Sequence, residues 1–183
     1  MIKRCIMIFP HFKNGQLIDN IRKKYDPLAE HVGPHITLVF PFKSELDTIK
    51  LKEHIETILF NIKPFQIILS GITPKVSFGN YLFVNIKEGN SQIIEIHKNL
   101  YTGILKDFFP QWLNGIDFLP HITVGCISNM DDFEKAVEET KNIDDVFETT
   151  VDAISVEIID ENEDSIIELN IPLSARENVE IIK

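Results

Sequence analysis

The stretch Pro-His-Ile-Thr-Leu at residues 34–38 decides the fold, because it returns almost letter for letter as Pro-His-Ile-Thr-Val at residues 120–124. The two copies lie 86 residues apart in a chain of 183 residues, which is close to half its length. A repeat at this distance predicts one duplicated supersecondary unit and not an array of many short repeats.

The first copy has the composition of a short strand. Ile, Thr, Leu and Val favour strands, and a proline is tolerated at the first strand position, where no backbone donor is needed. We therefore expect a strand that begins at His35. Side chains alternate between the faces of a strand, so His35 and Thr37 share one face while Ile36 and Leu38 take the other, apolar face.

The second copy places His121 and Thr123 in the same way, so that the chain offers two imidazoles and two hydroxyls. A histidine with a pKa near 6.5 can be neutral and accept a proton while a second, charged histidine donates one. Hydroxyl groups can donate hydrogen bonds to phosphate oxygens as charge develops there. This set of groups suits in-line displacement at phosphorus, and it requires no metal.

A zinc site is the competing use of two histidines. Such a site needs three or four ligands, usually with two of them closely spaced, and the sequence holds no such pair. Asp117 precedes His121 by four residues, but Pro120 lies between them, so they are not neighbours on a helix. The motifs of nucleoside-triphosphate binding, dinucleotide binding and serine hydrolysis are also absent from the sequence. We expect neither a metal nor another cofactor.

Composition and charge narrow the class of partner. The formal net charge is −10, and residues 131–164 carry 14 acidic and 2 basic side chains. An acidic protein binds long nucleic acid poorly, so a nucleic-acid substrate would be held at one end and not as an extended duplex. No run of eighteen apolar residues predicts a membrane span, and the apolar start at residues 5–9 is predicted to be the first strand and not a signal peptide. Cys5 and Cys126 are expected to be free thiols of a cytoplasmic protein, although a disulfide between them stays open.

The remaining elements follow from periodicity and from prolines. The expected strands are Arg4–Phe9, the motif strand from His35 closed by Pro41, Phe65–Leu69 continued irregularly past Gly71 and Pro74, Tyr81–Ile86, the motif strand from His121, Val151–Ile159 and Ile166–Pro172. The expected helices contain Leu17 to Tyr25, run from a cap at Ser44 to Leu59, run from Ser91 to Phe109, and follow a cap at Ser128 or Asn129.

Each half of the chain thus reads strand, helix, motif strand, helix, strand, and the second half adds one strand. We expect a single domain over residues 1–183, built from two lobes with a boundary near residue 75 (1–75 and 76–183). The predicted fold class is α+β. Two antiparallel sheets, or one strongly bent sheet, are related by a pseudo-two-fold axis and line a central cleft, with the helices outside.

Two His-x-Thr-x motifs, at residues 35–38 and 121–124, in the two halves of a chain of this size resemble the 2H phosphoesterase superfamily. The segments Ile-Met-Ile-Phe-Pro at 6–10 and Thr-Leu-Val-Phe-Pro-Phe at 37–42 are similar to its 2′-5′ RNA ligase branch, which includes LigT and the cyclic phosphodiesterases. The resemblance covers most of the chain in layout, and its specific part is the two tetrapeptides.

This resemblance implies a bilobal fold with a central cleft and metal-independent chemistry on phosphoesters of RNA ends or small nucleotides. It implies that His35 and His121 are acid and base and that Thr37 and Thr123 hold the phosphate. It leaves open which histidine is the acid, and whether the reaction is hydrolysis of a 2′,3′-cyclic phosphate, cleavage of a 2′-5′ linkage or ligation. We expect a monomer, because one chain contains the whole site.

Two other interpretations of the motifs stay open. The same groove could bind a phosphate-bearing ligand without turning it over, or both histidines could be buried parts of a scaffold. Other side chains with chemical potential are assigned the simpler roles of surface or core: His11 and His31 near the surface, His54 and His97 on helices and partly exposed, Lys43 and Lys75 in loops, and Tyr81, Phe83 and Trp112 in packing.

Overall fold

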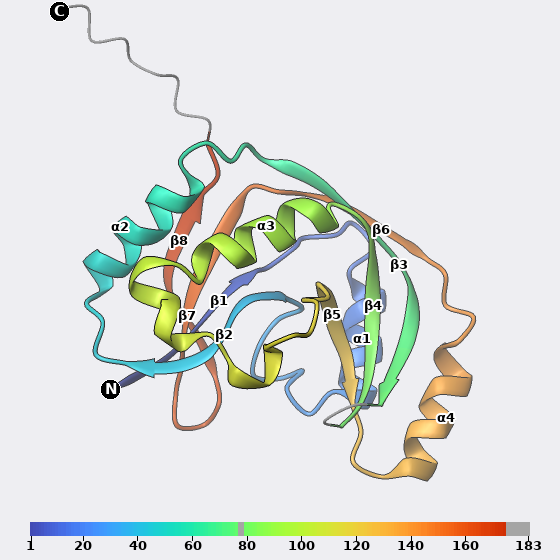
Figure 1. Ribbon diagram of the computed structural model, residues 1–183. Helices are drawn as coiled ribbons and strands as arrows, with labels where there is room; N and C mark the ends of the chain where they lie inside the picture. Colours follow the sequence, from blue (N-terminus) through green and yellow to red (C-terminus); the bar gives the residue numbers. More distant parts are fainter. Residues whose placement is uncertain (77–78, 175–183) are drawn as a thin grey trace, which may run out of the picture.

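The computed structural model describes residues 1–76 and 79–174 (Figure 1). The predicted second lobe, 76–183, therefore includes two stretches outside the described residues, 77–78 and 175–183. The helices are α1 (Gln16–Tyr25), α2 (Thr48–Leu59), α3 (Asn90–Leu100), the 3-10 helices η1 (Gly103–Phe108) and η2 (Gln111–Leu113), and α4 (Met130–Thr140). The strands are β1 (Ile2–Ile8), β2 (Ile36–Ser44), β3 (Phe65–Val76), β4 (Asn80–Glu88), β5 (His121–Cys126), β6 (Val146–Val151), β7 (Ala153–Ile159) and β8 (Ser165–Pro172).

The strands form two four-stranded antiparallel sheets, which confirms the predicted α+β class. The first sheet has the order β2-β1-β7-β8, and the second sheet has the order β5-β4-β3-β6. The first sheet thus combines the beginning and the end of the chain, and the second sheet contains the middle. Figure 1 shows the two sheets side by side, with helices packed on their outer faces.

The two motif strands occupy equivalent places. β2 is an edge strand of the first sheet and β5 is an edge strand of the second, and these two edges contact each other. Each motif strand pairs with the first strand of its own half, β1 or β4. The duplication predicted from the repeated pentapeptide therefore brings both motifs to the line where the sheets meet.

Buried apolar side chains alternate with less buried polar side chains along the two motifs, as expected from the sequence. Ile36 and Leu38 in β2, like Ile122 and Val124 in β5, are completely buried in the hydrophobic core. The histidine and threonine between them are only half-buried. Burial of the four aliphatic side chains anchors both motifs in the core, at roughly 1.5–3 kcal/mol for each side chain.

Helices are exchanged between the halves. α1, from the first half, packs on β5 in the second sheet, and α3, from the second half, packs on β2 in the first sheet. At Gly125 in β5 a Cβ atom would lie 3.1 Å from the Cβ of Tyr25, so the glycine permits the close approach of α1. No helix among residues 1–76 and 79–174 is long and apolar enough to cross a membrane.

The end of the first motif strand differs from the prediction. Pro41 does not close the strand, because β2 continues to Ser44 in pairing with β1. The register shifts between the pairs Ile6–Val39 and Arg4–Phe42, so the proline lies at an irregularity where no ladder donor is required. The predicted cap at Ser44 is wrong for the same reason. Asp47 caps α2 instead, and its carboxylate accepts hydrogen bonds from the first turn.

The long helix predicted from Ser91 to Phe109 is also wrong. α3 ends at Leu100, and a separate 3-10 helix begins at Gly103. Gly103 has a φ of 49°, in the left-handed region that favours glycine, so the α-helical conformation does not continue through this residue. The apolar periodicity of the sequence continues past this point, and therefore it predicted one helix where there are two.

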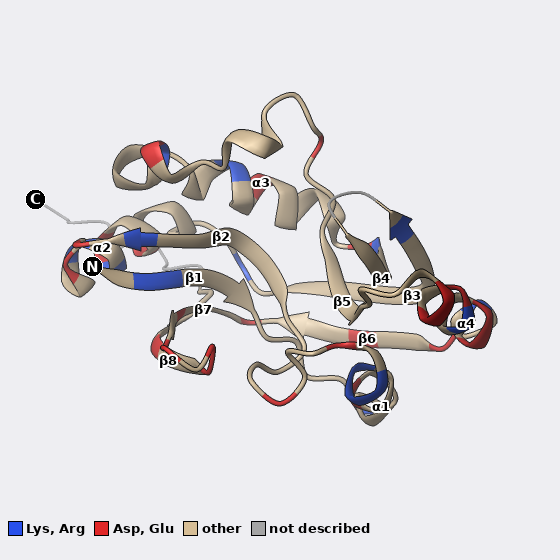
Figure 2. Ribbon diagram, turned by 90° about the horizontal axis from the view of Figure 1, so that it is seen from below, with Lys and Arg blue, Asp and Glu red and all other residues tan. Residues whose placement is uncertain are grey.

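The acidic segment contains a strand that the sequence did not reveal. β6 pairs with β3 in the second sheet, whereas β7 pairs with β1 in the first. The predicted strand Val151–Ile159 is confirmed as β7 from Ala153 onward, whereas Val151 ends β6 and the chain passes from one sheet to the other at Asp152. Asn129, and not Ser128, caps α4. Figure 2 shows acidic residues, in red, on α4, whereas β5 carries no Asp, Glu, Lys or Arg.

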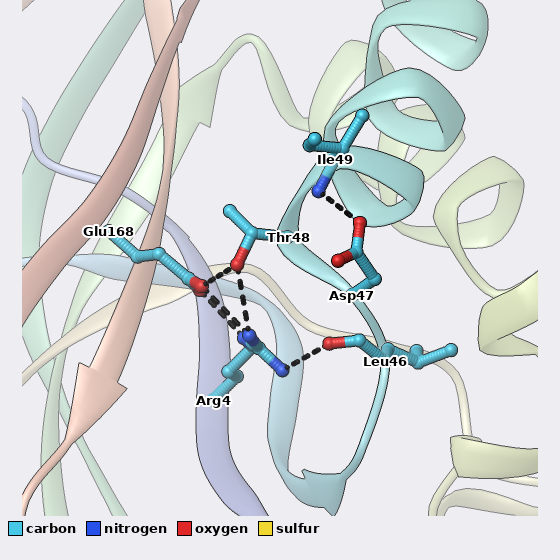
Figure 3. A network of polar contacts seen from close by, with 6 residues as sticks. All are labelled: Arg4, Leu46, Asp47, Thr48, Ile49 and Glu168. Carbon is cyan, nitrogen blue, oxygen red and sulfur yellow. Dashed lines mark hydrogen bonds and ion pairs between the residues drawn. The ribbon is translucent and has the colours of Figure 1, made fainter.

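A buried ion pair joins α2 to the first sheet (Figure 3). The guanidinium of Arg4 in β1 donates to both carboxylate oxygens of Glu168 in β8, at 2.6 and 2.8 Å. It also donates to the carbonyl of Leu46 at 3.0 Å, and Thr48 at the start of α2 donates to Glu168 at 2.6 Å. The network fixes the start of α2 against two strands that come from opposite ends of the chain.

Candidate active site

The imidazoles of the two motifs are held by identical local contacts. Nδ1 of His35 donates to the carbonyl oxygen of Gly33 at 2.9 Å, and Nδ1 of His121 donates to the carbonyl oxygen of Leu119 at 2.7 Å. In each motif the acceptor lies two residues before the histidine, with a proline between them.

This contact determines which nitrogen is available for chemistry. A carbonyl oxygen only accepts hydrogen bonds, so Nδ1 carries a hydrogen in both rings. In the neutral form the lone pair is therefore on Nε2. In both histidines the same atom, Nε2, lies outside this contact, and the backbone orients both rings.

The two histidines also influence each other electrostatically. Burial lowers the pKa of His121 to about 4, and the charge of His35 contributes to this lowering, which is consistent with the contact between β2 and β5. Burial likewise lowers the pKa of His35, while its hydrogen bond to Gly33 raises it and the charge of Arg22 lowers it. At neutral pH the unliganded protein has both rings mainly in the neutral form.

The predicted threonines lie on the same faces as the histidines. Thr37 is opposite Met7 of β1, and Thr123 is opposite Phe83 of β4. Both threonines are half-buried, as the histidines are. The structure thus brings all four predicted residues to two contacting edge strands, with each hydroxyl two positions after its imidazole.

Aromatic rings flank both imidazoles, but differently. Phe83 stacks on His121 with a centroid distance of 3.6 Å and an interplanar angle of 24°. Phe9, at the end of β1, lies at 6.0 Å from His35 with the rings tilted by 58°. The second imidazole is therefore covered on one ring face by Phe83, whereas Phe9 leaves more room beside the first.

Arg22 supports the first motif, although it lies outside that motif and was not among the candidate residues from the sequence. Its side chain is buried in α1 and pairs with Asp26 at 2.8 Å. It also donates to the carbonyl of Val32 at 2.8 Å. These bonds tie the loop that precedes the first motif to α1, and so they position Gly33 and His35.

The prediction that His97 is partly exposed is wrong. This histidine of α3 is buried, and its Nδ1 donates to the carbonyl oxygen of Leu38 in β2 at 2.7 Å. One turn later the hydroxyl of Tyr101 accepts a hydrogen bond from the backbone nitrogen of Phe40 at 2.8 Å. His97 of α3 and Tyr101, the residue that follows α3, thereby satisfy outer backbone groups of the first motif strand, where a further strand would otherwise pair.

His97 also reaches the second motif. Its ring stacks on Phe118 with a centroid distance of 3.6 Å and an interplanar angle of 5°. The next residue, Leu119, supplies the carbonyl that holds His121. One buried imidazole therefore contacts both the strand of the first motif and the segment that leads into the second. Two spacings in the sequence are signals of this arrangement: His97 shares the helical face of Ile93, Ile96 and Leu100, and Tyr101 follows it after four residues.

The other residues singled out from the sequence lie around the site or away from it. His11 is exposed, and His31 pairs with Asp164 at 2.8 Å. His54 on α2 shares a hydrogen bond with the carbonyl of Leu100. Lys43 is exposed at the far end of β2, Lys75 is exposed opposite Tyr81 in the second sheet, and Trp112 packs against Phe40. Within residues 1–76 and 79–174 no three His, Cys, Asp or Glu side chains are grouped so that they could hold a metal ion.

Comparisons with a family model and with related sequences agree on one family. The model of the 2′-5′ RNA ligase superfamily matches residues 9–163. A protein of Bacillus licheniformis, provisionally named a phosphoesterase, is 26% identical over 152 residues, which cover 82% of this chain and 86% of the relative. A protein of Geobacillus sp. with the same provisional name is 30% identical over 127 residues, covering 68% of this chain and 69% of the relative.

Solved structures have the same fold at low sequence identity. The TT0787 protein of Thermus thermophilus superposes with a TM-score of 0.66 at 13% identity, covering 96% of this chain and all of that protein. Escherichia coli LigT in complex with 3′-AMP superposes with a TM-score of 0.59 at 12% identity, covering 94% of this chain and 98% of LigT.

Proposed function

The chain belongs to the 2′-5′ RNA ligase superfamily, and from this premise we propose that it is a metal-independent phosphoesterase acting on RNA ends or nucleotides by two-histidine acid–base catalysis. The observation that carries the proposal is the matched hydrogen bond of His35 and His121, each from Nδ1 to the carbonyl two residues earlier. Two imidazoles that are held alike, on contacting strands, suit a pair of proton transfers at one phosphorus atom.

The proposed reaction is the opening of a 2′,3′-cyclic phosphate or the cleavage of a 2′-5′ phosphodiester by water. Nε2 of one neutral histidine takes a proton from water as the water oxygen bonds to phosphorus. The bond from phosphorus to a ribose oxygen breaks, and this oxygen takes the proton from Nε2 of the other, charged histidine. In ligation, a ribose hydroxyl would attack the cyclic phosphate in place of water.

Thr37 and Thr123 are proposed to hold the phosphate. Each hydroxyl can donate a hydrogen bond to a non-bridging oxygen, and such bonds strengthen as negative charge grows in the transition state. A bound phosphate also raises the pKa of both histidines, because an anion favours the charged imidazole. Substrate binding would therefore help one of the two low-pKa imidazoles to acquire the proton that it must donate.

Several features support a nucleotide as the substrate, a monomeric protein and a cytoplasmic location. Relatives of the chain are provisionally named phosphoesterases, and E. coli LigT has been crystallised with 3′-AMP, ATP and NADP+. Both motifs belong to one chain, so we propose a monomer with a single domain. Cys5 is buried and both cysteines are free, which suits a cytoplasmic protein.

The test uses the purified protein with EDTA and two substrates, adenosine 2′,3′-cyclic phosphate and a short RNA that ends in a 2′,3′-cyclic phosphate. Products are followed by mass. We expect a gain of one water in at least one substrate, and a loss of turnover of at least about a hundredfold in His35→Ala and in His121→Ala. His54→Ala is the matched control, because His54 lies on α2 outside the motifs.

Two results would contradict this function. Unchanged turnover in both motif variants would exclude acid–base catalysis by these histidines. Tight binding of the nucleotides without product, with the same affinity for wild-type protein and both variants, would favour the alternative of a module that binds phosphate without catalysis.

A further inference from the structure

A pocket of about 500 Å³ lies beside His35. Its wall includes Phe9, whose ring contacts His35, and Gly33, whose carbonyl holds Nδ1 of that histidine. A volume of this size lies within the range of small-ligand sites in proteins. Two residues of the pocket wall therefore contact His35, although His35 itself is not part of the wall.

Strand register shows that the pocket opens on the same face of the first sheet as the motif. Thr37 is opposite Met7, Met7 is opposite Ser155, and Ser155 is opposite Asn170. Directly opposed residues of antiparallel strands point to the same face. Ser155 and Asn170 line the pocket, so its floor continues the row of side chains that starts at the phosphate-binding threonine.

The side chains of the pocket wall suit an uncharged ligand that forms hydrogen bonds. None of the described residues that line it is a lysine or an arginine, and Asp152 contributes a carboxylate. Two histidines also belong to the wall: His31, whose Nδ1 is 2.8 Å from the carboxylate of Asp164, and the exposed His11. Ser155 donates to Oδ1 of Asn170 at 3.1 Å, which leaves the amide nitrogen of Asn170 as a donor for a ligand.

We propose that this pocket takes the nucleoside of a small nucleotide whose phosphate lies between the two motifs, and that it disfavours a nucleoside with any further phosphate. The inference rests on the proposed function and narrows its substrate class to nucleoside cyclic phosphates with a free 5′ hydroxyl. An aromatic wall, an amide donor and a carboxylate acceptor match a base and a ribose hydroxyl, and the carboxylate repels a second phosphate.

The second sheet is a poorer place for the nucleoside. Phe83, the nearest aromatic ring there, already stacks on His121 and so helps to orient the imidazole. Lys75 lies on the same face opposite Tyr81, where it would favour additional negative charge. The two sides of the site therefore differ in charge although their motifs are equivalent.

This difference sets the orientation of the substrate. In an in-line displacement the attacking water lies opposite the leaving ribose oxygen, so a nucleoside beside His35 puts the water beside His121. His35 would then donate the proton and His121 would accept one. Burial lowers the pKa of His121 to about 4, so this ring stays neutral near pH 7 and is free to accept a proton.

The test compares adenosine 2′,3′-cyclic phosphate with the same compound phosphorylated at its 5′ oxygen. We expect kcat/KM of the wild-type protein to be about tenfold higher for the compound with the free 5′ hydroxyl, as one nearby carboxylate predicts for a dianion at moderate distance. Asp152→Lys should reduce this ratio to about one or invert it. Glu134→Lys is the control, because it changes the net charge equally at an exposed position on α4.

A wild-type ratio of one or less, or a ratio that Asp152→Lys leaves unchanged, would overturn the inference. If neither compound is turned over, the proposed hydrolysis of these substrates has failed. The preference of the pocket is then tested by the binding of non-reacting nucleotides to the same protein. Calorimetry should then give weaker binding for adenosine 3′,5′-bisphosphate than for 3′-AMP. Equal or tighter binding of the bisphosphate, or no binding of 3′-AMP, would overturn the inference independently of catalysis.

Discussion

A carbonyl two residues before each histidine performs the same task for both catalytic candidates. By accepting from Nδ1 it fixes the ring orientation and the tautomer without any acidic partner. A carboxylate in this place would raise the pKa of the imidazole strongly, whereas the neutral carbonyl raises it less than burial lowers it. Each histidine therefore keeps a pKa below its ordinary value, and this has a measurable consequence.

We predict that kcat/KM against pH is bell-shaped with its maximum below about pH 6.5, because the pKa of each histidine is lowered from 6.5. The acidic limb reflects protonation of the base, for which the His121 pKa is about 4, and the alkaline limb reflects loss of the proton from the acid, whose pKa is lowered from 6.5. Because bound phosphate raises both pKa values, the maximum of kcat should lie at higher pH than that of kcat/KM. A maximum of kcat/KM above pH 7 would contradict this assignment.

His97 provides a second prediction for single residues. In His97→Leu the carbonyl of Leu38 loses its donor, and unfolding free energy should fall by about 1–3 kcal/mol. We also expect kcat to fall about tenfold at a temperature where the variant stays folded, with a smaller change in KM, because the contact positions both motifs and touches no substrate. His97→Asn keeps a donor near the position of Nδ1 and should recover most of kcat. If His97→Asn were no more active than His97→Leu, the hydrogen bond would not be what positions the motif.

Among the elements, α2 depends on charges from both ends of the chain. Glu168 and Arg4 are both nearly buried, and the hydrogen bonds from Arg4 lower the pKa of Glu168. Loss of one partner would leave the other charge buried without compensation, which costs about 3–5 kcal/mol, whereas replacement of both by apolar residues is milder.

We therefore expect Arg4→Met to be less stable than the double variant Arg4→Met/Glu168→Leu in urea unfolding at pH 7. The sign of the pH dependence follows from the lowered pKa of Glu168. Its stabilising contribution is complete above the unfolded pKa of about 4.3 and is lost as the pH falls through the lower, folded value. The stability difference between wild-type protein and Glu168→Gln should accordingly shrink on acidification below about pH 4. A difference that grows on acidification would refute this account.

Prediction from the sequence succeeded where local pattern and local structure coincide. The alternation of apolar and polar residues in the two motifs gave the buried and exposed faces of β2 and β5 correctly. It failed where a partner distant in the chain decides the outcome. The extension of β2 past Pro41 depends on pairing with β1, and the passage at Asp152 depends on two different sheets. His97 lies on the same face of α3 as the buried Ile93, Ile96 and Leu100, but its contacts with Leu38 and Phe118 come from other parts of the chain and no local pattern indicates them.

At the scale of the whole molecule, neither half of the chain contains all the strands of a sheet. β1 pairs with β7 near the end of the chain, β3 pairs with β4 and β6 in the second sheet, and each of α1 and α3 packs on the motif strand of the other half. The hydrophobic core is one cluster shared by both sheets. The two motifs can therefore come together only when the halves fold jointly.

This arrangement predicts a single cooperative unfolding transition. Far-ultraviolet circular dichroism, which reports on both sheets, and fluorescence of the single tryptophan, Trp112, should give the same midpoint in urea. A fragment of residues 1–76 should show no cooperative transition by itself, because its strands β1 and β3 lack the partners β7, β4 and β6. Two separated transitions in the full chain would show that the sheets fold as independent units.

The side chains of His97 and Tyr101 along β2 have a consequence for the behaviour of the protein at high concentration. An unpaired strand edge is a template on which another polypeptide can add, and this is a common start of aggregation. Here a helix occupies the donor and the acceptor that such a chain would use, at Phe40 and Leu38. The edge of β2 that contacts β5 is thus shielded from self-association by His97 of α3 and by Tyr101 directly after it.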